Sequence, residues 1–267
     1  MTGEKTGGPT LSVTIVAKDE ERTIADVLAA AAGLADEIVF LDSGSTDRTI
    51  EIAQGFGVRL YHQAWLGYSE QKNMALDLAR GEWILSLDAD EVMTPALVDE
   101  IRHTLSAGVP AHIDGFRIPR VLLIGDTPVR RGGFYPDAQL RLIRKGRGRF
   151  RSRIVHESIA VEGKVAQLKN DILHYAYKDV TQFAQTMDQY ARLSAQHYFQ
   201  QPHGRWRSSS LNEVLRPLWT LFYRQVVRGG VLGGPLCRQL NSIYADYVRK
   251  KIRYLRELEN AAAPVVR

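Results

Sequence analysis

Apolar and polar residues follow one another in regular blocks through the N-terminal part of the chain. Short apolar runs predict buried strands, and the segments between them carry apolar residues at the i, i+3, i+4 and i+7 spacing of a helix. This alternation is typical of an α/β fold, in which helices cover the faces of a parallel sheet. The expected strands are 11–17, 37–42, 58–61 and one beginning at Trp83, and the expected helices are 24–33, one carrying Ile50, Ala53 and Phe56, and 69–79.

The strand beginning at Trp83 ends in three carboxylates, Asp88, Asp90 and Glu91. Ligands of open α/β sheets bind at the carboxyl ends of the strands. If the chain stays extended, Asp88 and Asp90 point to the same side, and two hard oxygen ligands suit Mg²⁺ or Mn²⁺. The alternative is a solvated loop that begins the next helix. It is disfavoured because Thr94 and Pro95 supply a separate helix start.

The second half of the chain contains a basic region followed by helical segments. Residues 115–120 and 138–144 are predicted strands, and 117–153 contains eleven Lys and Arg against two Asp. Such a region is either a solvated face or a surface beside a diphosphate. Helices are expected at 179–198, 211–228, where Pro217 kinks or begins the helix, and 236–259. The predicted organisation is a flexible N-terminus (1–10), a catalytic domain (11–176) with nucleotide-binding (11–110) and acceptor (111–176) halves, a helical C-terminal region (177–259) and a tail (260–267).

Composition narrows the class of protein. The 267 residues are 45% hydrophobic and 24% charged, which is ordinary for a globular protein. The single cysteine excludes an internal disulfide and a Cys-rich zinc site and fits a reducing compartment. Because no apolar run is long enough to span a bilayer and the first ten residues lack the apolar core of a signal peptide, we expect a cytoplasmic location. The net charge of +5 indicates attraction to polyanions without choosing among them.

The expected turn after the first strand argues against two common nucleotide-binding motifs. It reads Lys18-Asp19-Glu20-Glu21-Arg22 in place of Gly-x-Gly-x-x-Gly, and no Gly-x-x-x-x-Gly-Lys-Ser/Thr occurs anywhere. Asp42 ends the second strand at the same sheet edge as Asp88 and Asp90. The pattern therefore predicts a site in which acidic side chains and a metal hold the nucleotide. The alternative for Asp42 alone is a helix cap, which is the less favoured interpretation.

Four blocks in this order resemble the inverting glycosyltransferases of family 2, which have the GT-A (Rossmann-like) fold. They are residues 13–21, Asp42-Ser43-Gly44-Ser45-Thr46-Asp47, Gln71-Lys72-Asn73 and Leu87-Asp88-Ala89-Asp90-Glu91. Residues 139–144 and Val155-His156-Glu157 are similar to the branch that includes lipopolysaccharide inner-core glucosyltransferases. The resemblance implies a mostly parallel sheet flanked by helices, with a helical C-terminal extension. One departure is Asp19, where the family usually has Asn.

The resemblance also implies roles for particular residues. Val16, Ala17 and Lys18 would surround the base of the donor, Asp42 would accept a hydrogen bond from a uracil-type imide, and Lys72 would lie near the base or the diphosphate. Asp88 would bind ribose and approach a Mg²⁺ or Mn²⁺ ion held by Asp90. Without the resemblance, Lys72 would be interpreted as a solvated charge. The nucleotide-binding set is Val16, Ala17, Lys18, Glu20, Asp42, Lys72 and Asp88, and the metal set is Asp88, Asp90 and His156.

An inverting transfer needs a carboxylate that takes the proton of the acceptor hydroxyl, and Glu157 is the candidate. His156 is a third metal ligand, an acceptor contact or an orienting group. Arg141 and Arg144 are the arginines that we expect at the diphosphate or the acceptor.

The expected function is metal-dependent transfer of a sugar, with UDP-glucose as donor by resemblance, to a lipopolysaccharide core or another lipid-linked saccharide. One alternative is a polyprenyl-phosphate glycosyltransferase, whose acceptor phosphate needs no protein base. Two alternatives come from other classes: a nucleotide-binding regulator without turnover and a basic nucleic-acid-binding protein. The latter is disfavoured because the chain has no recognised DNA or RNA motif.

The helices expected within 211–259 have apolar faces flanked by Arg and Lys. We expect them to dock the enzyme on an anionic membrane surface, peripheral to the inner face of the cytoplasmic membrane. The alternative is that these faces pack on the catalytic domain or on another subunit. The oligomeric state stays open.

Overall fold

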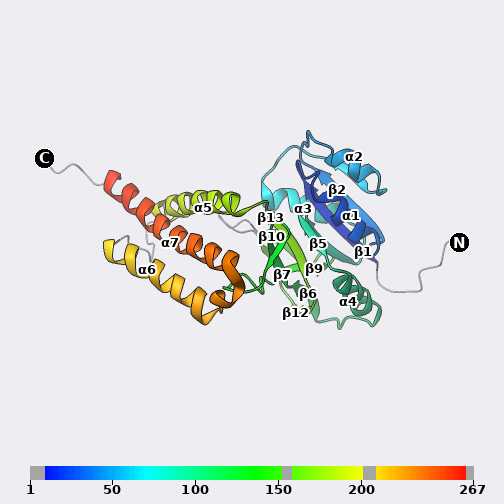
Figure 1. Cartoon of the computed structure of the whole chain (residues 1–267). Helices are drawn as coiled ribbons and strands as arrows, with labels where there is room; N and C mark the ends of the chain where they lie inside the picture. The colour runs from blue at the N-terminus through cyan, green and yellow to red at the C-terminus, as the bar shows by residue number, and fades with distance from the viewer. Residues whose placement is uncertain (1–9, 152–157, 201–208, 263–267) are drawn as a thin grey trace. The chain divides into compact units, whose positions relative to one another are not determined.

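The computed structural model describes residues 10–151, 158–200 and 209–262 (Figure 1). The chain divides into two compact units. Unit 1 comprises Met1–Val121 and Pro136–Ala176, and unit 2 comprises Leu122–Tyr135 and Tyr177–Arg267. The expected boundary near residue 176 coincides with a boundary between the units, but 122–135, expected in the catalytic domain, clusters with the C-terminal helices.

Unit 1 is built on a seven-stranded sheet with the strand order β12-β6-β9-β4-β1-β2-β3. Strand β1 pairs in parallel with β2 and β4, β2 pairs in parallel with β3, and β12 with β6, whereas β9 runs antiparallel to β4 and β6. The expected mostly parallel sheet is confirmed. Its strands are β1 (Leu11–Ala17), β2 (Glu37–Asp42), β3 (Arg59–His62), β4 (Trp83–Asp88), β6 (Ile113–Ile118), β9 (Gln139–Arg144) and β12 (Lys164–Gln167).

Helices cover both faces of this sheet. Apolar residues of α1 and α4 join one core cluster with Trp83, Leu85 and Leu87, whereas α3 joins a second cluster with Ile84. Because successive residues of β4 point to opposite faces, one strand contributes to both cores. The predicted cap of α4 is confirmed, since Thr94 Oγ1 accepts a hydrogen bond from the Leu97 amide. The helices are α1 (Ile24–Ala32), α2 (Thr49–Gln54), α3 (Tyr68–Leu78) and α4 (Pro95–Ser106).

The strand order reverses at β1. From β1 the chain builds outward through β2 and β3, then returns to place β4 on the other side of β1. In open α/β sheets such a reversal leaves a crevice outside the carboxyl ends of the two central strands. The loop after β1 and the end of β4 therefore meet where a ligand is expected.

Shorter strands complete unit 1. Strand β5 (Glu91–Met93) pairs antiparallel with β13 (Ile172–Tyr177), so that His174 lies opposite Glu91. Strands β10 (Gly148–Arg151) and β11 (Ser158–Val161) also pair antiparallel. The sequence also favours a short strand at 153–156, which lies outside the described residues.

Unit 2 consists of a hairpin and helices. Strand β7 (Arg120–Ile124), which continues from unit 1, pairs with β8 (Thr127–Val129), and Ile124 and Val129 pack in a core with Phe183, Met187 and Leu240. This packing explains why 122–135 belongs to unit 2. Pro217 lies inside a helix that continues on both sides of it. The helical elements are α5 (Val180–Gln200), α6 (Ser210–Phe222), the π-helix η1 (Tyr223–Val227), the 3-10 helix η2 (Gly230–Gly233) and α7 (Gly234–Ala262).

Among the helices that the structure describes, none combines the length and the hydropathy needed to cross a lipid bilayer.

Candidate active site

The loops that follow β1 and β2 are tied to each other. Asp19 Oδ1 accepts a hydrogen bond from the Thr46 amide (2.7 Å), and the Glu20 amide donates to Thr49 Oγ1 (2.8 Å). Asp19 has a positive φ of 56°, a backbone conformation that Asn and Asp tolerate better than most residues. Asp19, in place of the Asn that is usual in the family, therefore allows the same loop conformation. Its carboxylate stabilises the loop through the hydrogen bond from Thr46.

Asp42 is buried at the end of β2 and shapes the turn that follows. Its carboxylate accepts hydrogen bonds from the Gly44 amide (2.9 Å) and the Ser45 amide (3.2 Å). Burial opposes ionisation, but the hydrogen bonds outweigh it and hold the pKa of Asp42 below its ordinary value. Asp42 does not cap α2, which begins at Thr49, and it remains ionised at the sheet edge.

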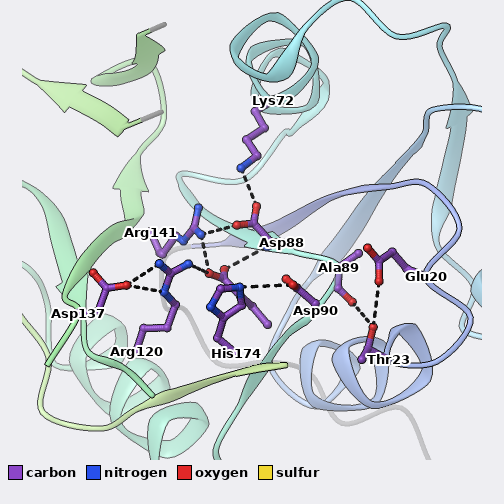
Figure 2. Close-up of polar contacts among 11 residues, drawn as sticks. Glu20, Thr23, Lys72, Asp88, Ala89, Asp90, Arg120, Asp137, Arg141 and His174 are labelled. Atoms are coloured by element: carbon purple, nitrogen blue, oxygen red, sulfur yellow. Dashed lines mark hydrogen bonds and ion pairs between the residues drawn. The ribbon is translucent and has the colours of Figure 1, made fainter. Parts of the chain in front are cut away.

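Asp88, at the end of β4, is held by two cations. Its Oδ1 lies 2.7 Å from Lys72 Nζ, and its Oδ2 accepts a hydrogen bond from Arg141 Nη2 at 2.6 Å (Figure 2). Burial raises the pKa of Asp88, but the nearby charges of Arg141 and Lys72 lower it by more. The pKa of Asp88 is therefore well below its usual range. The Asp88 side chain keeps 27% of its surface exposed. Lys72 is thus a paired group of the site and not a solvated surface charge.

Arg141 also contacts Glu91, a carboxylate that the sequence did not single out for the site. Arg141 Nη2 donates to Glu91 Oε1 at 2.5 Å, and Arg120 Nη1 donates to the same oxygen at 2.8 Å. Arg120 in turn pairs with Asp137 at 2.5 Å (Figure 2). Glu91 is fully buried, and its second oxygen accepts from the Asp88 amide at 3.1 Å. In this network arginines alternate with carboxylates, and the contacts fix the orientation of the Asp88 side chain.

Asp90 lies beside His174. The chain turns at Ala89 and Asp90, and the Asp90 Oδ2 atom lies 3.3 Å from His174 Nε2. The Tyr175 amide donates to the Asp90 carbonyl oxygen at 2.9 Å, which joins the turn to β13. His174 was missed because its proximity depends on the pairing of β13 with β5, and the sequence near it has no motif.

Glu20 completes an acidic group with Asp90. Glu20 Oε2 lies 3.4 Å from Thr23 Oγ1, and Thr23 donates to the Ala89 carbonyl oxygen at 2.9 Å (Figure 2). Burial and then the charge of Asp90 raise the pKa of Glu20 to about 7. Carboxylates arranged in this way repel each other unless a proton or a cation lies between them.

Two expectations about this site are corrected by the structure. The chain is not extended through Asp88 and Asp90, because residues 89 and 90 form a turn, so that the two carboxylates have different partners. Arg144 is not beside Asp88. It pairs in register with Trp83 at the opposite end of β4, where its guanidinium lies 4.7 Å from the Trp83 ring centre.

The other predicted residues lie as follows. Val16 is in register with Asp88, and Ala17 with Asp42, so β1 places both at the crevice, with Lys18 exposed just beyond them. His156 and Glu157 lie outside the described residues. Within the parts of the chain that the structure describes, no three His, Cys, Asp or Glu residues are grouped as a metal site.

The sequence profile of Glycosyl transferase family 2 matches residues 12–151, more than half of the chain and almost the whole of the sheet just described. The chain belongs to glycosyl transferase family 2. It is therefore a glycosyltransferase, and the charged side chains at the end of β4 lie at the sheet edge where open α/β sheets bind their ligands.

Two bacterial glycosyltransferases are similar to this chain. It is 37% identical over 152 residues to the lipopolysaccharide core biosynthesis glycosyltransferase LpsC of Rhizobium meliloti, covering 52% of this chain and 53% of LpsC. It is 26% identical over 228 residues to an uncharacterized glycosyltransferase of Rickettsia bellii, covering 82% of this chain and 76% of that protein. The chain thus spans about half of LpsC and about three quarters of the Rickettsia protein.

A solved structure confirms the fold. The mannosyltransferase PcManGT of Pyrobaculum calidifontis, in complex with GDP-Man and Mn²⁺, is similar with a TM-score of 0.52 over 97% of this chain and 77% of that one. The sequence identity is 14%, so this likeness concerns the fold alone. The GT-A architecture expected from the sequence is confirmed.

Proposed function

We propose that this family 2 enzyme is a metal-dependent inverting glycosyltransferase that transfers a sugar from a nucleoside diphosphate donor. The observation that carries the proposal is the ionised Asp88, fixed by Lys72 and Arg141 next to the pair Asp90 and His174. One side of this arrangement offers a carboxylate acceptor for the hydroxyl groups of ribose. The other side offers oxygen and nitrogen donors for a cation that accompanies a diphosphate.

The nucleotide would bind along the ends of β1, β2 and β4. Val16 and Ala17 would lie beneath the nucleotide, because parallel pairing aligns Val16 with Asp88 and Ala17 with Asp42. Asp42 is ionised, so it can accept the imide N–H of a uracil. Lys72, which is within reach of Asp88, would also contact the nucleotide or its diphosphate. Lys18 and Glu20, in the loop after β1, complete this part of the proposed site.

The side chains around Asp90 fit a divalent cation. Asp90 Oδ2 and His174 Nε2 are already close to each other, and Glu20 carries a raised pKa that a neighbouring cation would lower. A carboxylate with an imidazole suits Mn²⁺, and carboxylates with phosphate oxygens suit Mg²⁺. The bound ion would neutralise the charge that develops on the leaving diphosphate. We propose His174 as a ligand in addition to the sequence-based candidates Asp88, Asp90 and His156.

Glu157 remains the proposed general base. An inverting displacement requires a carboxylate that takes the proton of the acceptor hydroxyl on the face of the sugar opposite the diphosphate. Glu157 lies outside the described residues, so its role rests on the family resemblance and on this chemical requirement. Asp88 is unsuited to the task because Arg141 and Lys72 hold its pKa well below the usual range, and Glu91 is unsuited because it is fully buried.

The proposed donor is UDP-glucose, and the proposed acceptor is a lipopolysaccharide core or another lipid-linked saccharide. Support for the acceptor comes from the similarity to LpsC, named for lipopolysaccharide core biosynthesis. The UDP-glucose assignment rests on the resemblance of residues 139–144 and 155–157 to inner-core glucosyltransferases. Such an acceptor would place the enzyme at the inner face of the cytoplasmic membrane.

Calorimetry with UDP and GDP, each with and without Mn²⁺, tests the proposal. We expect UDP to bind tightly only with the metal and GDP to bind more weakly. A transfer assay with UDP-glucose and delipidated core saccharide, followed by determination of the product anomer, then tests the donor and the inversion. Metal-independent UDP binding would contradict the metal site, and a product with the donor's anomeric configuration would contradict the inverting mechanism.

A further inference from the structure

Helix α6 presents its apolar side to solvent. No residue of α6 is buried, and its large apolar side chains are among the most exposed in the described chain. Trp219 is 64% exposed, Leu218 58% and Phe222 50%. A surface helix of a globular protein normally turns its apolar side inward. This helix is therefore oriented for contact with something outside the unit that contains it.

The inner side of α6 is fixed to α7 by polar contacts. The two helices pack along each other (Figure 1), and Arg256 on α7 bonds to α6 twice: to Glu213 Oε2 at 2.7 Å and to Ser210 Oγ at 3.1 Å. Glu213 is largely covered by this packing. These contacts on the inner side of α6 hold its apolar side outward.

Helix α7, in contrast, uses its apolar side within unit 2. Leu240 and Leu255 are buried in core clusters with residues of α5 such as Phe183 and Ala191, and Ile252 is buried as well. The sequence-based expectation that the apolar face of 236–259 is available for a membrane is therefore corrected, because that face is covered by the packing of α5 on α7. The exposed large apolar residues of the expected surface lie on α6 and on the two short helices that follow it.

The exposed apolar surface continues from α6 into the following short helices. We define the apolar face as these exposed residues: Leu211, Val214, Leu215, Leu218, Trp219, Phe222, Tyr223, Val226, Val227, Val231 and Leu232. The Trp219 ring lies 5.7 Å from that of Phe222 and 6.5 Å from that of Tyr223, between ring centres. Single exposed apolar residues scattered over a surface are ordinary, but a group of neighbouring ones marks a site of interaction.

Most charges on the elements of the apolar face are positive, and the one acidic residue of α6, Glu213, is paired with Arg256. Residues 214–244 contain four arginines and no Asp or Glu, and Arg228 and Arg238 are exposed. A cavity of about 230 Å³ in unit 2 is lined by Arg130 and Arg131 together with Leu232, which also belongs to the apolar face. The surface thus combines exposed apolar and aromatic side chains with arginines. A partner that is both apolar and anionic would complement it.

We propose that the apolar face of α6, η1 and η2 docks the protein on the surface of an anionic lipid bilayer. The apolar side chains would enter the boundary between headgroups and acyl chains, where Trp and Tyr rings are favoured, and the arginines would contact lipid phosphates. A second copy of this chain fits less well, because a symmetric contact would bring the exposed Arg228 and Arg238 of both copies together, and the acidic residue of α6, Glu213, is already paired with Arg256.

The role of this docking rests on the proposed function, since it would hold the transferase beside a lipid-linked acceptor. The binding itself does not depend on that function. Flotation of the intact chain with vesicles requires neither donor nor acceptor, and UDP binding is measured separately. A failure of one experiment therefore leaves the other informative.

The test compares vesicles of phosphatidylcholine alone with vesicles that also contain phosphatidylglycerol, at low and high salt. We expect binding to the anionic vesicles that weakens at high salt. The double variant Leu218→Glu, Phe222→Glu should lower the bound-to-free ratio roughly tenfold or more, because carboxylates are unfavourable in the acyl region. Its control is Leu193→Glu, Phe199→Glu on α5, whose residues are of the same types and are 51% and 41% exposed; this variant should bind as the original chain does.

A second pair of variants tests the charges. Arg228→Gln, Arg238→Gln should weaken binding to the anionic vesicles, and Arg48→Gln, Arg102→Gln, which changes two exposed arginines in unit 1, should not. The proposal is overturned if the intact chain ignores anionic vesicles at low salt, or if the α6 variant binds as well as its α5 control. It is also overturned if the chain is a dimer that Leu218→Glu, Phe222→Glu dissociates, since the face would then be an interface between copies.

Discussion

Arg141 donates one hydrogen bond to Asp88 and another to Glu91 through the same Nη2 atom, at 2.6 and 2.5 Å. The arginine comes from β9, which runs antiparallel to the strand that Asp88 ends. One buried cation therefore links an active-site carboxylate to a carboxylate that solvent does not reach. Stability and nucleotide binding should for this reason depend on the same side chain.

Replacing Arg141 by Met should destabilise unit 1 more than replacing Arg144 by Met. Without Arg141, Glu91 would still pair with Arg120 and Asp88 with Lys72, but each carboxylate would lose one cationic partner. Removing one member of a buried ion pair costs about 3–5 kcal/mol. Urea denaturation of the two variants measures the difference. Equal losses would show that the Arg141 contacts do not stabilise the fold.

Asp90→Asn and His174→Ala should each weaken metal-dependent UDP binding by roughly tenfold or more, because each removes a proposed donor to the cation. Asp77→Asn, which changes an exposed aspartate on the same unit, is the control and should bind UDP normally. Calorimetry with Mn²⁺ provides the measurement. If His156→Ala abolishes this binding while His174→Ala leaves it intact, His156 is the histidine ligand.

Glu157→Gln should lower turnover by about 10²-fold or more, with little change in UDP binding, because glutamine keeps the size of the side chain but cannot accept a proton. Glu162→Gln is a control at an exposed position nearby in sequence. The measurement is kcat with the saccharide acceptor. Nearly normal turnover would favour the polyprenyl-phosphate transferase, whose acceptor is already an anion.

Asp188 should make the stability of unit 2 depend on acid pH. A hydrogen bond from Lys250, together with contacts from Tyr254 and Arg192, lowers the pKa of Asp188 to about 2. Because the folded-state pKa lies below the ordinary value of 3.8, the stabilisation is present above about pH 4 and is lost as the pH falls towards 2.

Asp188→Asn should therefore remove about 1 kcal/mol at neutral pH and almost nothing near pH 2. This figure is smaller than the pKa change alone implies, because water screens a group so close to the surface. Denaturation at several pH values, with Asp99→Asn as an exposed control, measures the effect. A loss that is the same at pH 2 and pH 7 would mean that the charge of Asp188 is not its cause.

The sequence by itself determined the first strands and helices of unit 1 and the sheet edge at which its carboxylates lie. Strand and helix periods report which face of an element is apolar, and they located β1, β2, β4 and the carboxylates at the ends of β2 and β4. The start of α4 at Thr94 and Pro95 was equally local, because a cap depends on adjacent residues. These features follow from short-range chemistry, and the structure reproduces them.

Tertiary structure decided which charged side chains meet. Glu91 looks like the third of three similar carboxylates in the sequence, but Arg120 and Arg141 bury it, whereas pairing of β13 with β5 brings His174 to Asp90. The register of β9 on β4 places Arg141 at the site and Arg144 at the other end of the strand. No local pattern contains this information, because each contact joins residues that are distant in sequence.

The same distinction applies to the C-terminal helices. Their amphipathic pattern predicted apolar faces on both α6 and α7, but it did not say what would cover each one. Packing of α5 covers the face of α7, while Glu213 and Ser210 hold α6 to Arg256 by its opposite side. Periodicity identifies a surface that must avoid water, and only the arrangement of the neighbouring helices determines whether the protein itself shields that surface.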